Sequence, residues 1–158
     1  MHIRRAQEQD IDDILRLLVE VDMVHHAIRP DLFKGPATKY SAQELAEKLK
    51  NDSDPVFVCA DDADRLLGYI FCQTVVTQES PLCTGIRTLY IDDLCVDERY
   101  RGQHVGKALY EYVLAYARQN GFYNITLHVW DGNDRALQFY RKMGMTDQYT
   151  CLEQILGD

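Results

Sequence analysis

Apolar residues recur every three or four positions in four stretches of the 158-residue chain, and this spacing predicts amphipathic helices. The stretches are residues 11–21, 41–49, 105–120 and 133–144. Their ends carry residues that usually start and stop helices. Ser41 and Glu44 form a capping-box pattern, and Asn133 is placed to cap the last helix. Gly121 and Gly144 each follow the end of a predicted helix.

Shorter runs of β-branched, aromatic and aliphatic residues separate these helices and predict strands. The runs are residues 2–6, 55–60, 66–77, 87–96 and 124–130, with one or two closing strands within 145–156. Residues 22–40 have no periodicity and contain Pro30, Gly35 and Pro36, which predicts a long loop. No repeat, linker or low-complexity segment is evident, so residues 1–158 are expected to form a single mixed α/β domain.

A polar turn joins the strand at 87–96 to the helix that follows it. A turn of this kind aims free backbone N–H groups and the positive end of the helix dipole at one point, where phosphate binds readily. Gly102 and Gly106 would let an anion approach the backbone closely, and Arg101 and Lys107 add positive charge. The same residues also suit an ordinary connection with solubilising charges, so their spacing leaves both readings open.

The turn from Arg101 to Gly106 resembles the Arg/Gln-x-x-Gly-x-Gly/Ala pyrophosphate loop of the GNAT family of N-acetyltransferases, with His104 in place of the central glycine. A second segment, residues 127–144, is similar to the last motif of the same family. Two motifs in the family's order and at its separation are more specific than either motif alone. The resemblance extends over nearly the whole chain and is strongest over residues 89–144.

This resemblance implies an α/β fold, the acyl-coenzyme A N-acyltransferase fold, with about four helices and a central mixed sheet of six to seven strands. Its fourth and fifth strands, residues 87–96 and 124–130, would be parallel and splayed apart, with the pantetheine of acetyl-coenzyme A between them. Acetyl-coenzyme A is the implied co-substrate, and no metal is implied. The implied cofactor contacts are Leu94, Cys95, Val96, Arg101, Gly102, Gln103, His104, Val105, Gly106, Lys107, Asn133, Ala136 and Tyr140.

Acetyl transfer from a thioester to an amine makes three demands on a protein. The amine must lose a proton, the carbonyl oxygen needs a preplaced hydrogen-bond donor, and the departing thiolate benefits from a proton. The resemblance gives the last role to Tyr140, as general acid. Backbone N–H groups near Leu94, Cys95 and Val96 are the expected donors to the oxygen. The alternative for Tyr140 is an aromatic side chain packed in the core, as neighbouring Phe139 suggests for this helix.

Asp92 and Asp93 are the candidates for the group that receives the amine. Neighbouring residues of a regular strand point to opposite faces, so one carboxylate is expected to enter the cleft. The segment 90–96 is similar to the corresponding strand of the spermidine/spermine acetyltransferases, in which a residue aligned with Asp92 contacts the amine. Asp92 is therefore the preferred candidate, either as a base, directly or through water, or only as a group that attracts and orients the cation.

A net charge of −8 opposes nucleic-acid binding and favours a cationic acceptor, either a small-molecule amine or a basic peptide. No apolar run is long enough to span a membrane and no secretory signal is evident, which predicts a cytoplasmic protein. Five cysteines are spread singly, without a Cys-x-x-Cys pair, which argues against disulfides and zinc. His25 and His26 are adjacent but lack a third ligand at a suitable spacing, so no metal site is predicted.

Other interpretations use the same residues. A non-catalytic module that binds or senses acyl-coenzyme A could share the fold, although Tyr140 and Asp92 favour an enzyme. A different phosphate-binding α/β protein would need no acyl chemistry, and the second motif argues against it. Cys95 could carry an acyl group, but no histidine is paired with it locally, and the family transfers directly in a ternary complex. A homodimer formed through the C-terminal strands is a further expectation.

Overall fold

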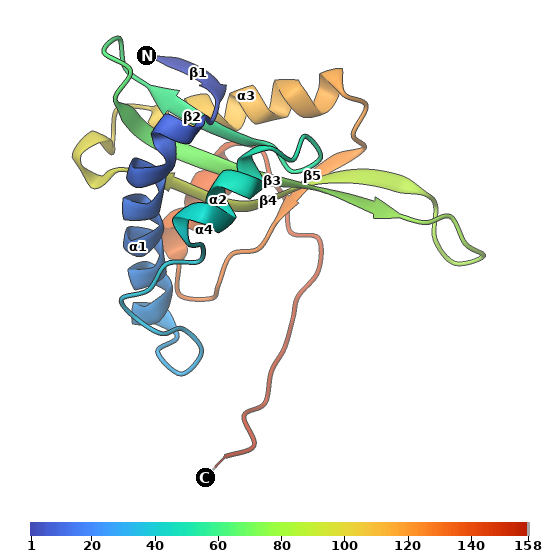
Figure 1. Cartoon of the computed structure of the whole chain (residues 1–158). Coiled ribbons are helices and arrows are strands. Elements are labelled where there is room, and N and C mark those ends of the chain that lie inside the picture. Colours follow the sequence, from blue (N-terminus) through green and yellow to red (C-terminus); the bar gives the residue numbers. More distant parts are fainter. Residues whose placement is uncertain (158) are drawn as a thin grey trace. The chain divides into compact units, whose positions relative to one another are not determined.

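A single mixed sheet organises the first part of the chain (Figure 1). Its strands lie in the order β1-β2-β3-β4-β5 and are antiparallel except for β4 and β5, which are parallel. The strands are β1 (His2–Arg5), β2 (Val56–Ala60), β3 (Leu66–Thr77), β4 (Ile86–Val96) and β5 (Asn124–Leu127). The structure is a computed structural model that describes residues 1–157. The predicted mixed sheet, with its parallel fourth and fifth strands, is confirmed.

The chain forms two compact units, which divide between His128 and Val129, and each is described by itself. The first unit contains the sheet and three helices, and the second contains one helix. The helices are α1 (Ile11–Ile28), α2 (Ala42–Leu49), α3 (Val105–Gln119) and α4 (Asp134–Lys142), with short 3₁₀ turns η1 (Glu8–Asp10) and η2 (Glu98–Tyr100). The expected four helices are present in the described residues, and a single domain over 1–158 stays a prediction.

Helices of the first unit cover both faces of the sheet (Figure 1). Alternation along β2 explains this arrangement, because successive side chains of a strand point to opposite faces. Val56 and Val58 join the core cluster that also holds buried residues of α1 and α2. Phe57 points the other way and packs edge-on against Tyr112 and Tyr116 of α3, at ring distances of 5.0 and 5.2 Å.

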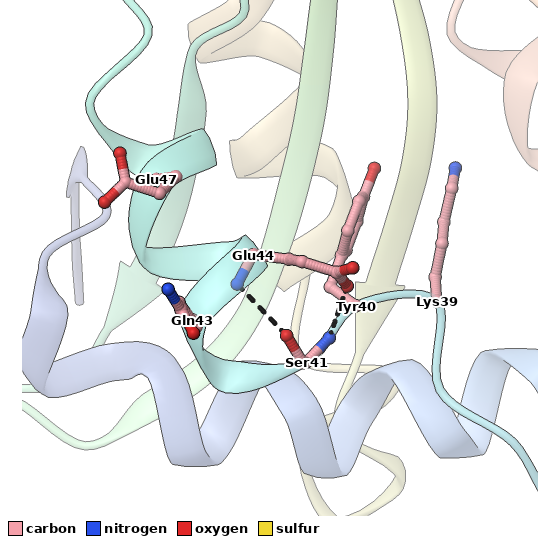
Figure 2. A pocket seen from close by; sticks show the side chains of 6 residues that line it. All are labelled: Lys39, Tyr40, Ser41, Gln43, Glu44 and Glu47. Atoms are coloured by element: carbon pink, nitrogen blue, oxygen red, sulfur yellow. Dashed lines mark hydrogen bonds between the residues drawn. The ribbon is translucent and has the colours of Figure 1, made fainter.

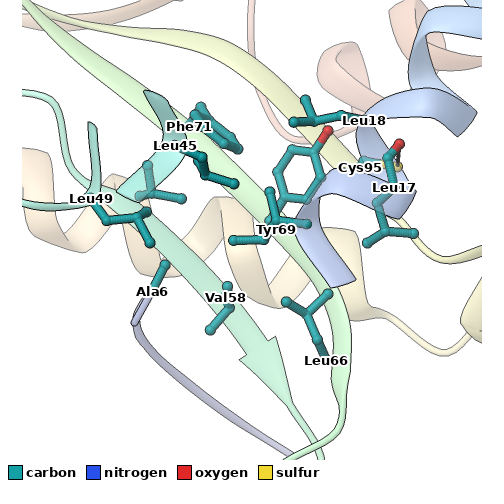
Figure 3. Packing of buried hydrophobic residues seen from close by; sticks show 12 residues of the cluster. Ala6, Leu17, Leu18, Leu45, Leu49, Val58, Leu66, Tyr69, Phe71 and Cys95 are labelled. Carbon is teal, nitrogen blue, oxygen red and sulfur yellow. Dashed lines mark hydrogen bonds between the residues drawn. The ribbon is translucent and has the colours of Figure 1, made fainter. Parts of the chain in front are cut away.

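The main core lies between the sheet and helices α1 and α2 (Figure 3). Tyr69 and Phe71 of β3 meet edge to face at 5.0 Å, and both are fully or almost fully buried. Leu17 of α1 and Leu45 of α2 close over them without any exposed surface. Burial of one such leucine is worth roughly 1.5–3 kcal/mol, so this cluster holds β3 and its neighbour β4 in place.

Local sequence signals fix several helix ends as expected. The Ser41 hydroxyl accepts a 3.1 Å hydrogen bond from the Glu44 backbone N–H, and the Glu44 carboxylate accepts one of 2.8 Å from the Ser41 N–H. Asn133 Oδ1 accepts from the Ala136 N–H at 3.3 Å and so caps α4. Gly121 adopts a φ of 69° just after α3, a left-handed conformation that suits glycine.

The predicted strand count is wrong. Six to seven strands were expected, but the sheet has five strands within residues 1–157. No strand forms between residues 145 and 156, and β5 ends at Leu127 rather than at 130. Leu152 and Leu156 stay exposed there. A strand needs a neighbour to satisfy its backbone hydrogen bonds, and local composition cannot supply that neighbour.

The predicted start of the long loop is also wrong, because α1 continues to Ile28. Its last turn carries His25 and His26, near the negative end of the helix dipole. His26 Nδ1 lies 2.6 Å from the carbonyl oxygen of Phe33, and the His25 ring lies 5.2 Å from the Phe33 ring. Both imidazoles therefore contact the chain that leaves the helix. Within residues 1–157, no group of three or more His, Cys, Asp or Glu side chains is arranged to hold a metal.

Candidate active site

β4 extends beyond its parallel partner. Its pairing with β5 ends at Ile91, whereas its pairing with β3 continues to Val96. In the part of the chain that the structure describes, no strand covers the β5 side of residues 92–96. Leu94 and Cys95 lie in this stretch together with Val96. Their backbone groups on that side are therefore placed to pair with an extended ligand, as the sequence predicts for pantetheine.

A β-bulge interrupts β4 at Asp92. Phe71 of β3 lies opposite Asp93, and the next residue, Cys72, lies opposite Ile91, so Asp92 has no opposite residue of its own. A bulge breaks the regular alternation of side chains along a strand. The expectation that neighbouring carboxylates point to opposite faces is therefore wrong here. Both side chains reach the face of the sheet that α1 and α2 cover, as their partners demonstrate.

The carboxylate of Asp92 binds the ammonium group of Lys39, which lies in the loop before α2. The Lys39 side chain is 49% exposed and the Asp92 side chain 14% exposed. Burial alone would lower the pKa of Lys39, but the hydrogen bond and charge of Asp92 outweigh it, so the pKa of Lys39 lies above its usual value. The residue predicted to receive a cationic amine thus already holds a cation of this chain.

Asp93 has a different partner. The buried hydroxyl of Tyr69 donates a 2.8 Å hydrogen bond to Asp93 Oδ2. Dense packing around the carboxyl raises the pKa of Asp93 to about 6, although the Tyr69 hydrogen bond and the charge of Lys39 act in the opposite direction. The two neighbouring carboxylates therefore lie in distinct surroundings, with Asp92 paired to a cation and Asp93 paired to a neutral phenol.

A hollow of about 600 Å³ opens beside Lys39 and is lined by the start of α2 (Figure 2). Lys39 and Tyr40 project in the same direction from the chain that leads into α2 (Figure 2). The lining residues are Lys39, Tyr40, Ser41, Gln43, Glu44 and Glu47. The Tyr40 ring stacks on Phe71 at 5.9 Å, which ties this hollow to the same face of the sheet as Asp93.

Asp97 anchors the turn that follows β4. Its carboxylate is fully buried, accepts hydrogen bonds from Arg16 of α1 at 2.8 Å and from Arg99 at 2.6 Å, and caps η2 through the Arg99 N–H at 3.0 Å. The hydrogen bonds from Arg99 hold the pKa of Asp97 well below its usual value. This charged cluster fixes where β4 stops and where the predicted phosphate loop begins.

The predicted phosphate loop forms the entry into α3. Gly102 has a φ of 78° and His104 a φ of 64°, so both adopt the left-handed conformation. Histidine tolerates this region better than most residues, which explains how it replaces the family's glycine. The side chain of His104 makes no capping hydrogen bond. The first N–H groups of α3 therefore keep their direction toward an incoming anion.

The two cationic side chains of this loop have different partners. Arg101 is exposed, and its Nε donates to the carbonyl oxygen of Val96 at 3.3 Å. Lys107 lies 3.7 Å from Glu111 one helical turn further on, an exposed pair of small energetic worth. Both cations lie at the entry to α3, so both are placed to attract a phosphate.

Cys95 is one of three buried cysteines, together with Cys59 and Cys72. Its thiol lies 3.7 Å from the Leu17 carbonyl oxygen, in the core between β4 and α1. Burial raises the pKa of Cys95 to about 12, which disfavours the thiolate that an acyl-enzyme route would need. Contact of Cys95 with a cofactor would therefore involve its backbone.

The second unit carries the remaining predicted site residues. Asn133 caps α4 through Ala136, and Tyr140 lies in the last turns of the same helix. The rings of Phe139 and Tyr140 meet edge to face at 5.1 Å, and the Tyr140 carbonyl oxygen accepts from the N–H groups of Met143 and Met145. The position of Tyr140 in its helix is thus fixed by local contacts.

Two functional neighbours were missed by sequence reasoning. Lys39 lies in an aperiodic loop, 53 residues before Asp92, and nothing in its surroundings marks it as a partner of that carboxylate. Tyr69 lies in the run 66–77, which was predicted only to form a strand. The capping box at Ser41 placed the start of α2, and so the end of the loop that carries Lys39, but it gave no signal for the contact with Asp92.

The model of the Acetyltransferase (GNAT) family matches residues 21–145, which include both motifs. A thialysine N-epsilon-acetyltransferase from Bos taurus is 30% identical over 156 residues, covering 92% of this chain and 84% of that protein. The peptidyl-lysine N-acetyltransferase YjaB from Salmonella typhimurium is 27% identical over 145 residues, covering 91% and 82%.

Solved structures resemble this chain over its whole length. The x-ray structure of a tetramutant of the BH1408 protein from Bacillus halodurans superimposes with a TM-score of 0.93 at 31% sequence identity, covering 99% of this chain and 100% of that chain. A probable acetyltransferase of known structure superimposes with a TM-score of 0.76 at 20% identity, which bears on the fold alone. Within the described residues, no helix has the length and apolar character needed to cross a membrane.

Proposed function

Because this chain belongs to the GNAT family of acetyltransferases, we propose that it moves an acetyl group from acetyl-coenzyme A to a primary amine of a cationic small molecule or basic peptide. The chain is an acetyl-transferring enzyme of a family that uses acetyl-coenzyme A as co-substrate. Two of its relatives are named for lysine-type amines, thialysine and peptidyl-lysine, which supports such an acceptor. The transfer is direct, within a ternary complex.

Acetyl-coenzyme A supplies the thioester carbon that the amine attacks. The entry into α3 binds its diphosphate through residues Arg101, Gly102, Gln103, His104, Val105, Gly106 and Lys107. Two features support this fit: the helix amides are not capped by His104, and no atom lies within 4 Å of a Cβ built at Gly102. A bulky anion therefore has room to approach the backbone.

The exposed edge of β4 orients the thioester. Backbone N–H groups near Leu94, Cys95 and Val96, on the open edge of β4, donate to pantetheine and to the carbonyl oxygen on which negative charge grows. Donors fixed in a strand need no reorganisation when that charge appears, which is why they lower the barrier. The end of the β4–β5 pairing at Ile91 supports this role, because the donors on that side of the strand are left without a strand partner in residues 1–157.

Asp92 receives the acceptor amine. It acts as a base that takes the amine proton, directly or through water, or it attracts and orients the cation without taking the proton. Its place at the bulge, beside the open edge of β4, supports both versions of this role. The net charge of −8 adds a long-range attraction for cationic acceptors.

Tyr140 gives a proton to the departing sulfur as general acid. Asn133 and Ala136, at the first turn of α4, contact the cofactor in this proposal. A phenol with a pKa near 10 can protonate a thiolate as the carbon–sulfur bond breaks, and proton donation of this kind contributes roughly 10²–10⁴-fold to rate. The family motif around Asn133 and Tyr140 supports the assignment.

One observation carries this proposal above the others: the bulged carboxylate Asp92 lies next to an uncovered strand edge that leads to the helix start at Val105. The test measures free thiol release from acetyl-coenzyme A with a panel of amines, together with calorimetry of coenzyme A binding. Micromolar binding and thiol release with a cationic amine are the expected results.

Binding without thiol release from any amine would favour a sensing module instead. Absence of heat on addition of coenzyme A would refute the phosphate site itself. As a matched control, Lys142→Gln removes one exposed-helix cation outside the entry to α3, so it is expected to leave coenzyme A binding unchanged, whereas Lys107→Gln weakens it.

We also propose a homodimer formed through the C-terminal segment and a reducing, cytoplasmic location. Leu152 and Leu156 are exposed by 87% and 91%. Exposure of such apolar side chains to water is unfavourable, and a partner surface would bury them. All five cysteines are free thiols, which suits a reducing compartment. Light scattering of the wild type and of Leu152→Ser tests the dimer, which the substitution is expected to weaken.

A further inference from the structure

We propose that Lys39 is a specificity-determining residue that selects acceptors carrying a carboxylate besides the reacting amine, the charge pattern of a free amino acid with a side-chain amine. This inference rests on the proposed function, because it requires Asp92 to receive the acceptor amine. It names the substrate class within the wider group of cationic amines.

The ion pair between Lys39 and Asp92 carries this inference. An acceptor amine that approaches Asp92 as an ammonium ion meets a carboxylate that already holds an ammonium ion. Two cations on one carboxylate repel each other, so the incoming group displaces the Lys39 side chain. Lys39 is half-exposed and has a flexible four-carbon stem, which allows it to move without unfolding the loop.

The displaced ammonium group then loses its ion pair with Asp92. Asp93 is the next carboxylate and attracts Lys39 through its charge, but its Oδ2 already accepts the Tyr69 hydroxyl and no hydrogen bond joins it to Lys39 in the described residues. Lys48 adds a second cation, because the ammonium groups of Lys39 and Lys48 both lie 5.7 Å from the centre of the Tyr40 ring. In the described part of the chain, no carboxylate forms an ion pair with Lys48. An anionic group arriving here would therefore meet two lysines.

The carboxylates that line the hollow beside Lys39 already have other partners, so they do not replace Asp92 as the partner of Lys39. Glu44 accepts a hydrogen bond from the Ser41 N–H as part of the capping box, and Glu47 pairs with Lys50 at 3.1 Å. The hollow of about 600 Å³ has room for the body of a small molecule. An acceptor that brings its own carboxylate exchanges one ion pair for two, its amine on Asp92 and its carboxylate on Lys39.

This charge arrangement distinguishes three acceptors of similar length. Free lysine has both the amine and the carboxylate. Lysine amide keeps the two amines but replaces the carboxylate with a neutral amide, and 1,5-diaminopentane has amines only. A lysine within a peptide also lacks a carboxylate at that position. The inference therefore ranks free lysine above lysine amide and 1,5-diaminopentane as a substrate, although all three have a primary amine on a flexible chain.

The experiment measures kcat/KM for these three acceptors with the wild type, Lys39→Gln and Lys39→Arg, by thiol release. For the wild type, kcat/KM with lysine is expected to exceed that with lysine amide about tenfold or more, mainly through KM, because a charge pair of this kind governs ground-state binding. Lys39→Gln is expected to reduce that ratio to near one, and Lys39→Arg to retain most of it.

Other outcomes separate this inference from the proposed function. A wild type that uses lysine amide or 1,5-diaminopentane as well as lysine would overturn the inference and leave the enzyme's function intact. The same holds if Lys39→Gln folds, turns over lysine and keeps the wild-type ratio. No thiol release with any amine would instead refute the proposed function, and with it this inference.

Discussion

The hydroxyl of Tyr69 donates a 2.8 Å hydrogen bond to the carboxylate of Asp93, between neighbouring strands and from a phenol with no exposed surface. The pair lies directly beside the bulged Asp92. Packing around Asp93 raises its pKa to about 6, so this carboxyl exchanges its proton close to neutral pH. The charge on the floor of the candidate site therefore changes with pH in a range where enzymes work.

The first prediction concerns the pH dependence of stability. Between pH 4 and pH 6 the folded chain retains a proton on Asp93 that the unfolded chain, with a pKa of 3.8, has lost. The contribution of Asp93 to the free energy of unfolding therefore falls as pH rises through this window, by up to about 3 kcal/mol. Urea unfolding gives the free energy of unfolding of the wild type and of Asp93→Asn at pH 4 and at pH 7. The difference between the two proteins should be smaller at pH 7 than at pH 4 by this amount.

Asp97 acts with the opposite sign, because its pKa is held low and its contribution is lost as pH falls below the unfolded value. This effect is common to the wild type and to Asp93→Asn, so it cancels in their difference. Asp62→Asn, which removes an almost fully exposed carboxylate, serves as the control and should show no such dependence. A constant difference between wild type and Asp93→Asn across the window would contradict the assignment.

The second prediction concerns the entry to α3. His104 has a φ of 64°, a conformation that costs a residue with a Cβ about 1–2 kcal/mol and costs glycine almost nothing. Part of the gain is lost to the greater freedom of glycine in the unfolded chain, so His104→Gly should stabilise the protein by about 1 kcal/mol. Thermal unfolding measures this effect.

His104→Ala is the matched control, because it removes the imidazole but keeps the Cβ. It should give no stabilisation, and calorimetry should find coenzyme A binding retained in both variants, since the backbone N–H groups stay in place. Equal stability changes in the two variants would mean that the imidazole, and not the backbone conformation, determines the energy at this position.

The third prediction separates the two roles proposed for Asp92. If Asp92 takes the amine proton, Asp92→Asn lowers kcat by about 10²–10⁴-fold and removes the acidic limb of the pH–rate profile. If it only attracts the cation, the substitution raises KM and leaves that limb in place. Asp62→Asn removes the same charge from an exposed hairpin tip and should change neither parameter. Unchanged kcat and KM in Asp92→Asn would exclude both roles.

The fourth prediction concerns Tyr140. Tyr140→Phe retains the ring that packs against Phe139 and removes the phenolic proton. The substitution should lower kcat about 10²-fold or more, because the proton donor is lost. The same change at Tyr123, whose side chain is 74% exposed, should leave thiol release unaffected. Wild-type turnover by Tyr140→Phe would show that the sulfur leaves without help from this residue.

The sequence by itself determined the local features of this protein. Helix caps depend on hydrogen bonds between residues three apart, so Ser41 with Glu44 and Asn133 with Ala136 could be read directly from the chain. The phosphate-loop pattern was equally local, because Arg101 to Gly106 form one turn. Alternation and helical spacing placed all five strands and the starts of all four helices within a few residues, whereas α1 continues seven residues beyond its predicted end, from residue 21 to Ile28.

Tertiary structure alone decided the contacts between distant segments. The bulge at Asp92 arises from the register between β3 and β4, and no sequence pattern within β4 predicts it. Lys39 and Tyr69 reach the two carboxylates only because the core packs their elements against the same face of the sheet. The prediction of closing strands within residues 145–156 failed for the same reason. A strand forms only where a neighbouring strand accepts its backbone hydrogen bonds.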